Sequence, residues 1–201
     1  MHLVVGLGNP GPRYVDTRHN AGFLVIDRLG SRWNASCDKS MFGALVDKAL
    51  VNSCSAVLAK PQKFMNRSGH PVSSVRGYYK IEVSDIVVVH DDVDLPLGRI
   101  KVKSGGGHGG HKGVRDITQQ LGNSEFVRIR FGVSRPPEGW DTADYVLQKW
   151  NDDDSELLGG AIERAADAVE AVLRAGVKQA MNDFNSRVET VEGPTSAGTL
   201  E

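Results

Sequence analysis

A histidine near the start of the chain, His19, and an aspartate near its middle, Asp91, are the residues best suited to acid–base chemistry. His19 stands just before a predicted helix, and Asp91 follows the β-branched run 86–89, which is typical of a buried central strand. A carboxylate that faces an imidazole fixes its tautomer and raises its basicity, as a base acting on water requires. The pair is a candidate dyad, although His19 alone is equally well explained as a capping or packing residue.

The sequence around Asp91 also allows a metal site. His90, Asp91, Asp92 and Asp94 stand close together in the sequence and could be ligands for a hard cation. However, neighbouring side chains of a strand point in different directions. The dyad with His19 is therefore the preferred interpretation.

A glycine-rich loop at residues 6–11 follows the first predicted strand and matches the dinucleotide-binding pattern G-x-G-x-x-G. In that fold a helix begins within the motif, so that its amides face a pyrophosphate. Here two nearby prolines remove amide donors and disfavour an early helix. The loop is better interpreted as a rigid turn that presents Asn9 to a pocket, while Gly8 and Gly11 let a substrate approach the backbone.

Two further segments offer groups that bind substrate. The glycine-rich stretch 105–113 leads into a predicted helix, and its exposed amides suit a phosphate or a ribose. His108 and His111 could instead hold zinc, but no further ligand stands at a supporting spacing. In the segment 60–69, the amide of Asn66 can hold a carbonyl or an oxyanion, or be an ordinary helix N-cap.

The elements that must position these motifs alternate between strands and helices. Strands are predicted at 3–6, 43–49, 55–59, 86–89, 100–102 and 127–133, and helices at 21–30, 68–79, 114–121 and 152–185, the last interrupted near Gly176. This order predicts an α/β fold, in which helices cover both faces of a sheet and functional loops gather beyond one end of the strands.

Length and composition fit one globular domain of 201 residues with a net charge of -1. The two cysteines, Cys37 and Cys54, form no C-x-x-C pair and are expected to be reduced, buried thiols. Without a recognisable signal peptide or membrane-spanning segment, the protein is expected to be cytoplasmic. The small, polar stretch 188–201 is expected to be a disordered tail, which leaves 1–187 as the domain.

Charge is distributed unevenly along the chain. Between Arg99 and Arg135 there are eight basic residues and only two acidic ones. Such a run indicates contact with phosphates, or else a solvated surface without a partner.

Five motifs in the same order make the chain resemble bacterial peptidyl-tRNA hydrolases over roughly residues 1–187. They are the segments 6–11, 17–22, 64–69, 90–95 and 105–113. The resemblance implies a monomeric, three-layer α/β/α enzyme with a mixed twisted sheet. It also implies hydrolysis of the ester between a peptide and the 3′ end of tRNA, with no cofactor, no metal, and no DNA or membrane as partner.

By similarity to this family, His19 is the base that activates water and Asp91 orients it. Residues expected to bind substrate are Asn9, Tyr14, Phe64, Asn66 and Lys112. Lys103 and Arg130 match the basic pair with which the family grips a tRNA phosphate, a contact that carries no sequence information.

Lys112 is a departure, because the family usually has Asn at this position. A lysine can donate to a carbonyl or a phosphate, but it cannot accept a hydrogen bond and it adds a positive charge near His19. We therefore expect it to affect efficiency. A noncatalytic RNA-binding protein on the same scaffold is the second hypothesis, and the retention of both His19 and Asp91 argues against it.

Overall fold

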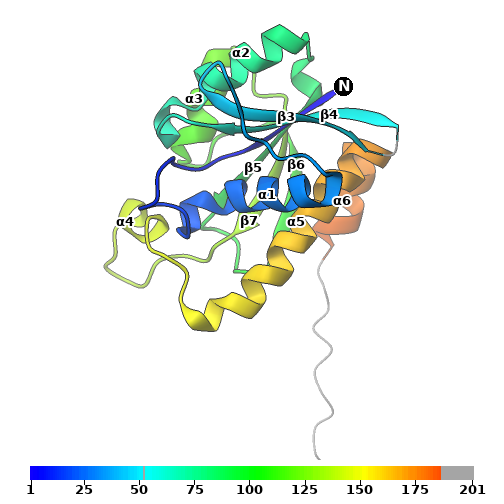
Figure 1. Cartoon of the computed structure of the whole chain (residues 1–201). Helices are drawn as coiled ribbons and strands as arrows, with labels where there is room; N and C mark the ends of the chain where they lie inside the picture. Colours follow the sequence, from blue (N-terminus) through cyan, green and yellow to red (C-terminus); the bar gives the residue numbers. More distant parts are fainter. Residues whose placement is uncertain (52, 187–201) are drawn as a thin grey trace, which may run out of the picture.

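A single mixed sheet of seven strands organises the molecule, in a computed structural model that describes residues 1–51 and 53–186 (Figure 1). The strands follow one another across the sheet in the order β2-β3-β4-β1-β5-β7-β6. Their bounds are β1 His2–Gly6, β2 Lys39–Met41, β3 Ala44–Val51, β4 Cys54–Pro61, β5 Ile86–Asp92, β6 Ile100–Ser104 and β7 Val127–Gly132.

The central strands β4, β1, β5 and β7 are parallel, and the outer strands β2, β3 and β6 run antiparallel to their neighbours. Strand β1 pairs its apolar residues with those of β5, as in Val4 with Val87. Both strands are buried on their two faces, which explains why they read as continuous apolar runs.

Helices cover both faces of the sheet and make three layers (Figure 1). One face packs against α1 (Ala21–Trp33), α5 (Ser155–Ala175) and α6 (Val177–Asn185), and the other against α2 (Gly69–Tyr79) and α3 (Lys112–Leu121). The short helix α4 (Thr142–Val146) lies beside the start of α1 (Figure 1). The predicted α/β/α class is confirmed.

Close backbone packing fixes the start of α1 against the sheet. A Cβ at Gly22 would collide with the backbone of Leu7 and Val89, so only glycine lets the helix approach here. This contact sets the position of His19, which stands in a 3₁₀ turn, Arg18–Asn20, directly before α1.

Most predicted elements are present, with differences at their ends. Helix α1 continues past Gly30 to Trp33, and β5 continues through Asp91 to Asp92. The sequence patterns missed β2 and α4, which are only three and five residues long and too short to show a periodicity. The tail expected at 188–201 lies outside the described residues. No helix of the described part is long and apolar enough to cross a membrane.

The carboxyl ends of the parallel strands all face the same end of the sheet. Strand β1 leads to α1 on one face, whereas β4 leads to α2 on the other. The two connections therefore diverge, and the crevice left at such a switch point is where open α/β sheets bind ligands.

Candidate active site

His19 and Asp91 are in direct contact, as their sequence positions predicted. His19 Nδ1 lies 2.9 and 3.0 Å from the two carboxylate oxygens of Asp91. A carboxylate can only accept here, so Nδ1 carries the proton and Nε2 keeps its lone pair. The Asp91 side chain is 3% exposed and that of His19 13%, which leaves the imidazole accessible from the pocket.

His111 is a third member of this group. Its Nε2 lies 2.9 Å from Asp91 Oδ1, and its Nδ1 accepts the Val114 N–H at the start of α3. Because Nδ1 must accept, the proton of neutral His111 is on Nε2 and is donated to Asp91. The two imidazoles thus face one carboxylate with opposite nitrogens.

His19 and His111 stabilise the ionised form of Asp91. Burial by itself raises the pKa of this carboxyl, but His19 and His111 together bring the pKa well below its ordinary value. Asp91 therefore stays ionised, as an orienting carboxylate must.

His90 lies on the opposite face of β5 from Asp91, as strand alternation requires. Its ring packs edge-on against His111 with the ring centres 4.8 Å apart, and its Nδ1 donates to the Asp91 carbonyl. Burial, followed by the neighbouring His111, lowers the pKa of His90 to about 3. His90 is therefore a neutral, buried residue that packs against His111, and it is not a candidate for the base.

Asn9 is held at the cavity by its own hydrogen bonds. Its Oδ1 accepts the Met65 N–H at 2.8 Å, so its two amide protons are directed elsewhere. Its backbone exchanges two hydrogen bonds with the buried Asn20 side chain. At Gly8 the ring of Phe23 occupies the space where a Cβ would lie, so packing within the protein already requires a glycine here.

A cavity of about 650 Å³ opens beside the dyad. Besides His19 and Asp91, its lining consists of Asn9, Phe64, Met65, Asn66, Val93, Gly110, His111, Lys112, Asp141, Thr142, Ala143, Val146 and Leu147. Of the predicted substrate-binding residues, only Tyr14 is not in this lining. It contacts Phe64 edge-on, with ring centres 6.4 Å apart, and so extends the cavity's aromatic rim.

The cavity lining contains both apolar and charged side chains. Val93, the α4 residues Ala143 and Val146, and Leu147 directly after α4 are apolar residues of the lining, which we call the α4 wall. Lys112, at the start of α3, and Asp141, directly before α4, also line the cavity. An apolar wall suits an acyl side chain, and a cation suits a phosphate or carbonyl.

Lys103 and Arg130 lie on the same face of the antiparallel pair β6 and β7, where Lys101 is the direct partner of Arg130. Lys103 is exposed, whereas Arg130 Nε binds Asp92 at 2.6 Å. Two other arginines of the basic run, Arg99 and Arg128, have internal partners too, since both bind backbone carbonyls. The run is therefore less positive at the surface than its sequence indicates.

The metal sites considered from the sequence are not assembled. Asp92 binds Arg130 and Asp94 binds Arg135, so neither joins Asp91. Ligand atoms of His19, Asp91 and His111 do lie within 4.8 Å of one another. Hydrogen bonds already occupy both nitrogens of His111, so neither nitrogen has a lone pair available to a metal. This favours a hydrogen bond, and not a metal ion, between His111 and Asp91.

The dinucleotide alternative also disagrees with the fold. The first helical turn begins at Arg18, well after the glycine-rich loop, so the helix does not begin within the motif. The loop therefore lacks the feature that binds a pyrophosphate.

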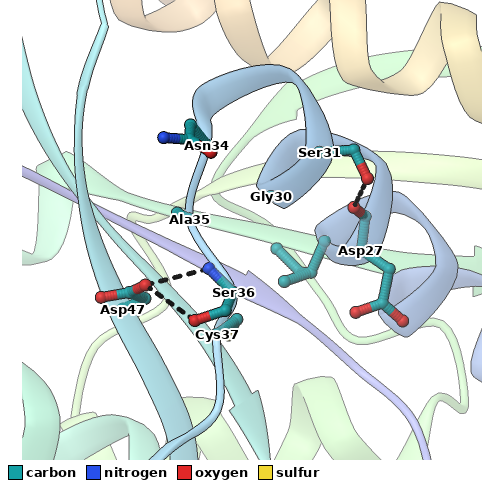
Figure 2. Close-up of a pocket in the computed structure, with 9 residues that line it drawn as sticks. Asp27, Gly30, Ser31, Asn34, Ala35, Ser36, Cys37 and Asp47 are labelled. Atoms are coloured by element: carbon teal, nitrogen blue, oxygen red, sulfur yellow. Dashed lines mark hydrogen bonds between the residues drawn. The ribbon is translucent and has the colours of Figure 1, made fainter.

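A second cavity of about 580 Å³ lies at the carboxyl end of α1, between Asn34 and Asp47 (Figure 2). Asp47 accepts hydrogen bonds from Ser36 there. Burial raises the pKa of the Cys37 thiol to about 11, so Cys37 is an inert thiol. Cys54, expected to be buried, is only partly so.

Three parts of the site were missed from the sequence. His111 was considered only as a zinc ligand, although a histidine directly before a helix could have been read as its N-cap. The α4 wall comes from a helix too short to show a periodicity in the sequence. The contacts of Arg18 join segments that are far apart in the sequence.

Comparisons with known proteins agree on one family. The family model for peptidyl-tRNA hydrolase matches residues 3–192. Relatives with this name include one from Citrifermentans bemidjiense, 44% identical over 92% of this chain and 98% of the relative, and one from Geobacillus kaustophilus, 44% identical over 92% and 100%. The crystal structure of peptidyl-tRNA hydrolase from Acinetobacter baumannii matches with a TM-score of 0.87 and 35% identity, over 92% of this chain and 95% of that one.

Proposed function

The chain belongs to the peptidyl-tRNA hydrolase family and hydrolyses peptidyl-tRNA, and from this premise we propose that His19 and Asp91 carry out the chemistry in the cavity beside them. The observation that carries the proposal is the hydrogen bond between His19 Nδ1 and Asp91, since it leaves Nε2 free to act as a base. The bond cleaved is the ester between the peptide and the 3′ end of tRNA.

In the proposed mechanism, a water molecule between His19 Nε2 and the ester carbonyl loses a proton to the imidazole as its oxygen attacks. Asp91 stabilises the imidazolium that forms. The tetrahedral intermediate then collapses, the 3′ oxygen of the tRNA leaves, and His19 returns the proton to it. The products are a free peptide and a free tRNA.

The amide protons of Asn9 are suited to the oxyanion. Because the Met65 N–H fixes Asn9 Oδ1, the side chain presents donors at a fixed orientation. Asn66 lines the same cavity and is exposed, so it can reach the ester without displacing a protein partner.

We assign different residues of the cavity lining to the two halves of the substrate. The α4 wall contacts the peptide, because apolar residues bury an acyl side chain favourably. Lys112, Lys103 and Arg130 contact the tRNA phosphates, and Tyr14 with Phe64 forms an aromatic rim of the cavity. We propose a monomer that acts without a metal in the cytoplasm, where its tRNA substrate is used.

A noncatalytic RNA-binding role is distinguished by one measurement. The purified protein and its Asp91→Asn variant are each incubated with peptidyl-tRNA, and the amount of free tRNA released by each is measured. We expect turnover by the unaltered protein and a large loss in the variant with tRNA binding retained. Binding without turnover in both proteins would support the noncatalytic hypothesis.

A further inference from the structure

Arg18, the residue directly before His19, is a buried arginine with an unusual set of partners. Its side chain is 9% exposed and its Nη2 lies 3.0 Å from an Asp154 carboxylate oxygen. Its Nη1 donates to the Lys149 carbonyl at 2.7 Å. The guanidinium lies over two aromatic rings, 4.7 Å from the centre of Tyr145 and 5.2 Å from that of Trp150.

These partners all belong to one segment, residues 145–154, which includes the end of α4 and the residues that follow it. The backbones are joined as well. Arg18 N donates to the Gln148 carbonyl at 3.1 Å, Thr17 forms an antiparallel bridge with Lys149, and Trp150 N donates to the Asp16 carbonyl at 3.2 Å. The same short stretch of chain therefore carries both the base and the attachment of the α4 wall.

The wall needs such an attachment. Helix α4 has five residues, far fewer than an isolated helix requires to be stable in water. Helix α4 is also attached through the Tyr145 hydroxyl, which donates a hydrogen bond at 2.8 Å to the carbonyl of Val133, the residue after β7. An arginine suits the attachment because its planar group can donate to a carboxylate and a carbonyl while stacking on aromatic rings.

We propose that Arg18 is a positioning residue that holds the α4 wall at a fixed separation from His19 and thereby determines how tightly the acyl group of the substrate is bound. The inference rests on the function proposed above, in which this wall contacts the peptide. It predicts a role in substrate binding for a residue that lies outside the cavity lining.

The test compares Arg18→Met with Arg32→Met on one tRNA carrying either N-acetylphenylalanine or N-acetylglycine. Arg32 is a matched control, because it lies on α1 and forms ion pairs with α5 away from the cavity. Arg18→Met should raise KM for the phenylalanyl ester by roughly tenfold more than for the glycyl ester, the discrimination that apolar pocket contacts provide. Arg32→Met should leave the ratio of the two KM values unchanged.

A purely structural role for Arg18 would lower the rates with both esters by the same factor, and that result would overturn the inference. The pH profile of kcat should keep its shape in Arg18→Met, because the contact of His19 with Asp91 remains; a displaced profile would also contradict the proposal.

If Arg18→Met does not fold, Asp154→Asn provides a second test, because it removes only the ion pair. It should shift the ratio of the two KM values in the same direction, and an unchanged ratio would count against the proposal. Failure of the unaltered protein to cleave either ester would instead reject the proposed function.

Discussion

His19 and His111 contact the same carboxylate, but their surroundings give them different tasks. The Nε2 of His19 lies on the cavity side, whereas both nitrogens of His111 are engaged, one by Asp91 and one by the Val114 amide. An imidazole with both nitrogens occupied cannot accept a proton from water without losing a bond. Only His19 can therefore serve as the base, and His111 fixes the carboxylate.

The first prediction concerns His19. Replacing it with alanine should lower kcat by roughly two to four decades, the usual contribution of a positioned base. Affinity for tRNA should be nearly unchanged, since the tRNA is held elsewhere. Single-turnover rates and filter binding measure the two quantities, and near-normal turnover in His19→Ala would refute the assignment.

His90 makes stability depend on pH. Its pKa falls from 6.5 to about 3 on folding, chiefly because it is buried, so between these values the unfolded chain binds a proton that the folded chain does not. The free energy of unfolding should therefore decrease as pH falls through this window, by at most about 1.4 kcal/mol per pH unit.

His90→Phe keeps a ring at this position and removes the titrating group. We expect the variant to lose less stability than the unaltered protein between neutral pH and about pH 4, as measured by urea unfolding at a series of pH values. Parallel stability curves for the two proteins would show that His90 does not carry this dependence.

At the scale of elements, the edge pair β6 and β7 presents its cations on one face. The register places Lys101 opposite Arg130 and Lys103 opposite Arg128, so all four side chains emerge on the side covered by α2 and α3. Arg128 is buried there and holds the carbonyls of Gly106 and Gly107. Lys103 is exposed and remains available to a phosphate.

Lys103→Ala should weaken tRNA binding and reduce the slope of log Kobs against log salt by about one, because one phosphate contact is lost. The control is Lys178→Ala, an exposed lysine on α6, on the other face of the sheet. Titration with labelled tRNA at several salt concentrations measures both. An equal effect of the two substitutions would indicate a general charge effect in place of a specific contact.

At the scale of the whole molecule, one sheet serves two cores. Leu3 and Val5 of β1 pack under α2 and α3, and Val4 packs under α1. Because each central strand contributes to both cores, neither face can be formed alone. We propose that residues 1–187 form a single domain, with the site at the strand ends where the two layers meet.

The whole enzyme should retain its activity in excess chelator, since we assign the chemistry to His19, and since one proton of His19 and one proton of His111 already bridge to Asp91. The measurement is hydrolysis of peptidyl-tRNA before and after treatment with chelator and dialysis. Activity that is lost in chelator and restored by one divalent cation would make His19, Asp91 and His111 candidate ligands instead.

The sequence by itself determined most of the elements and their order, though not β2 and α4. The β-branched run 86–89 and the helical spacing in 152–185 are local properties, and both produced the expected strand and helices. It also placed His19 and Asp91 at the same end of the sheet, because both follow features that a parallel α/β topology brings together. The resemblance of the five motifs then indicated the chemistry.

The tertiary structure alone decided which charged groups meet. His111 reaches Asp91 across the end of β5, Arg130 binds Asp92, and Arg18 binds Asp154, which is 136 residues away in the chain. Such contacts depend on the packing of separate layers, to which sequence spacing gives no access. For the same reason the sequence does not predict the short helix α4, because only the tertiary structure brings its apolar residues to the cavity beside His19.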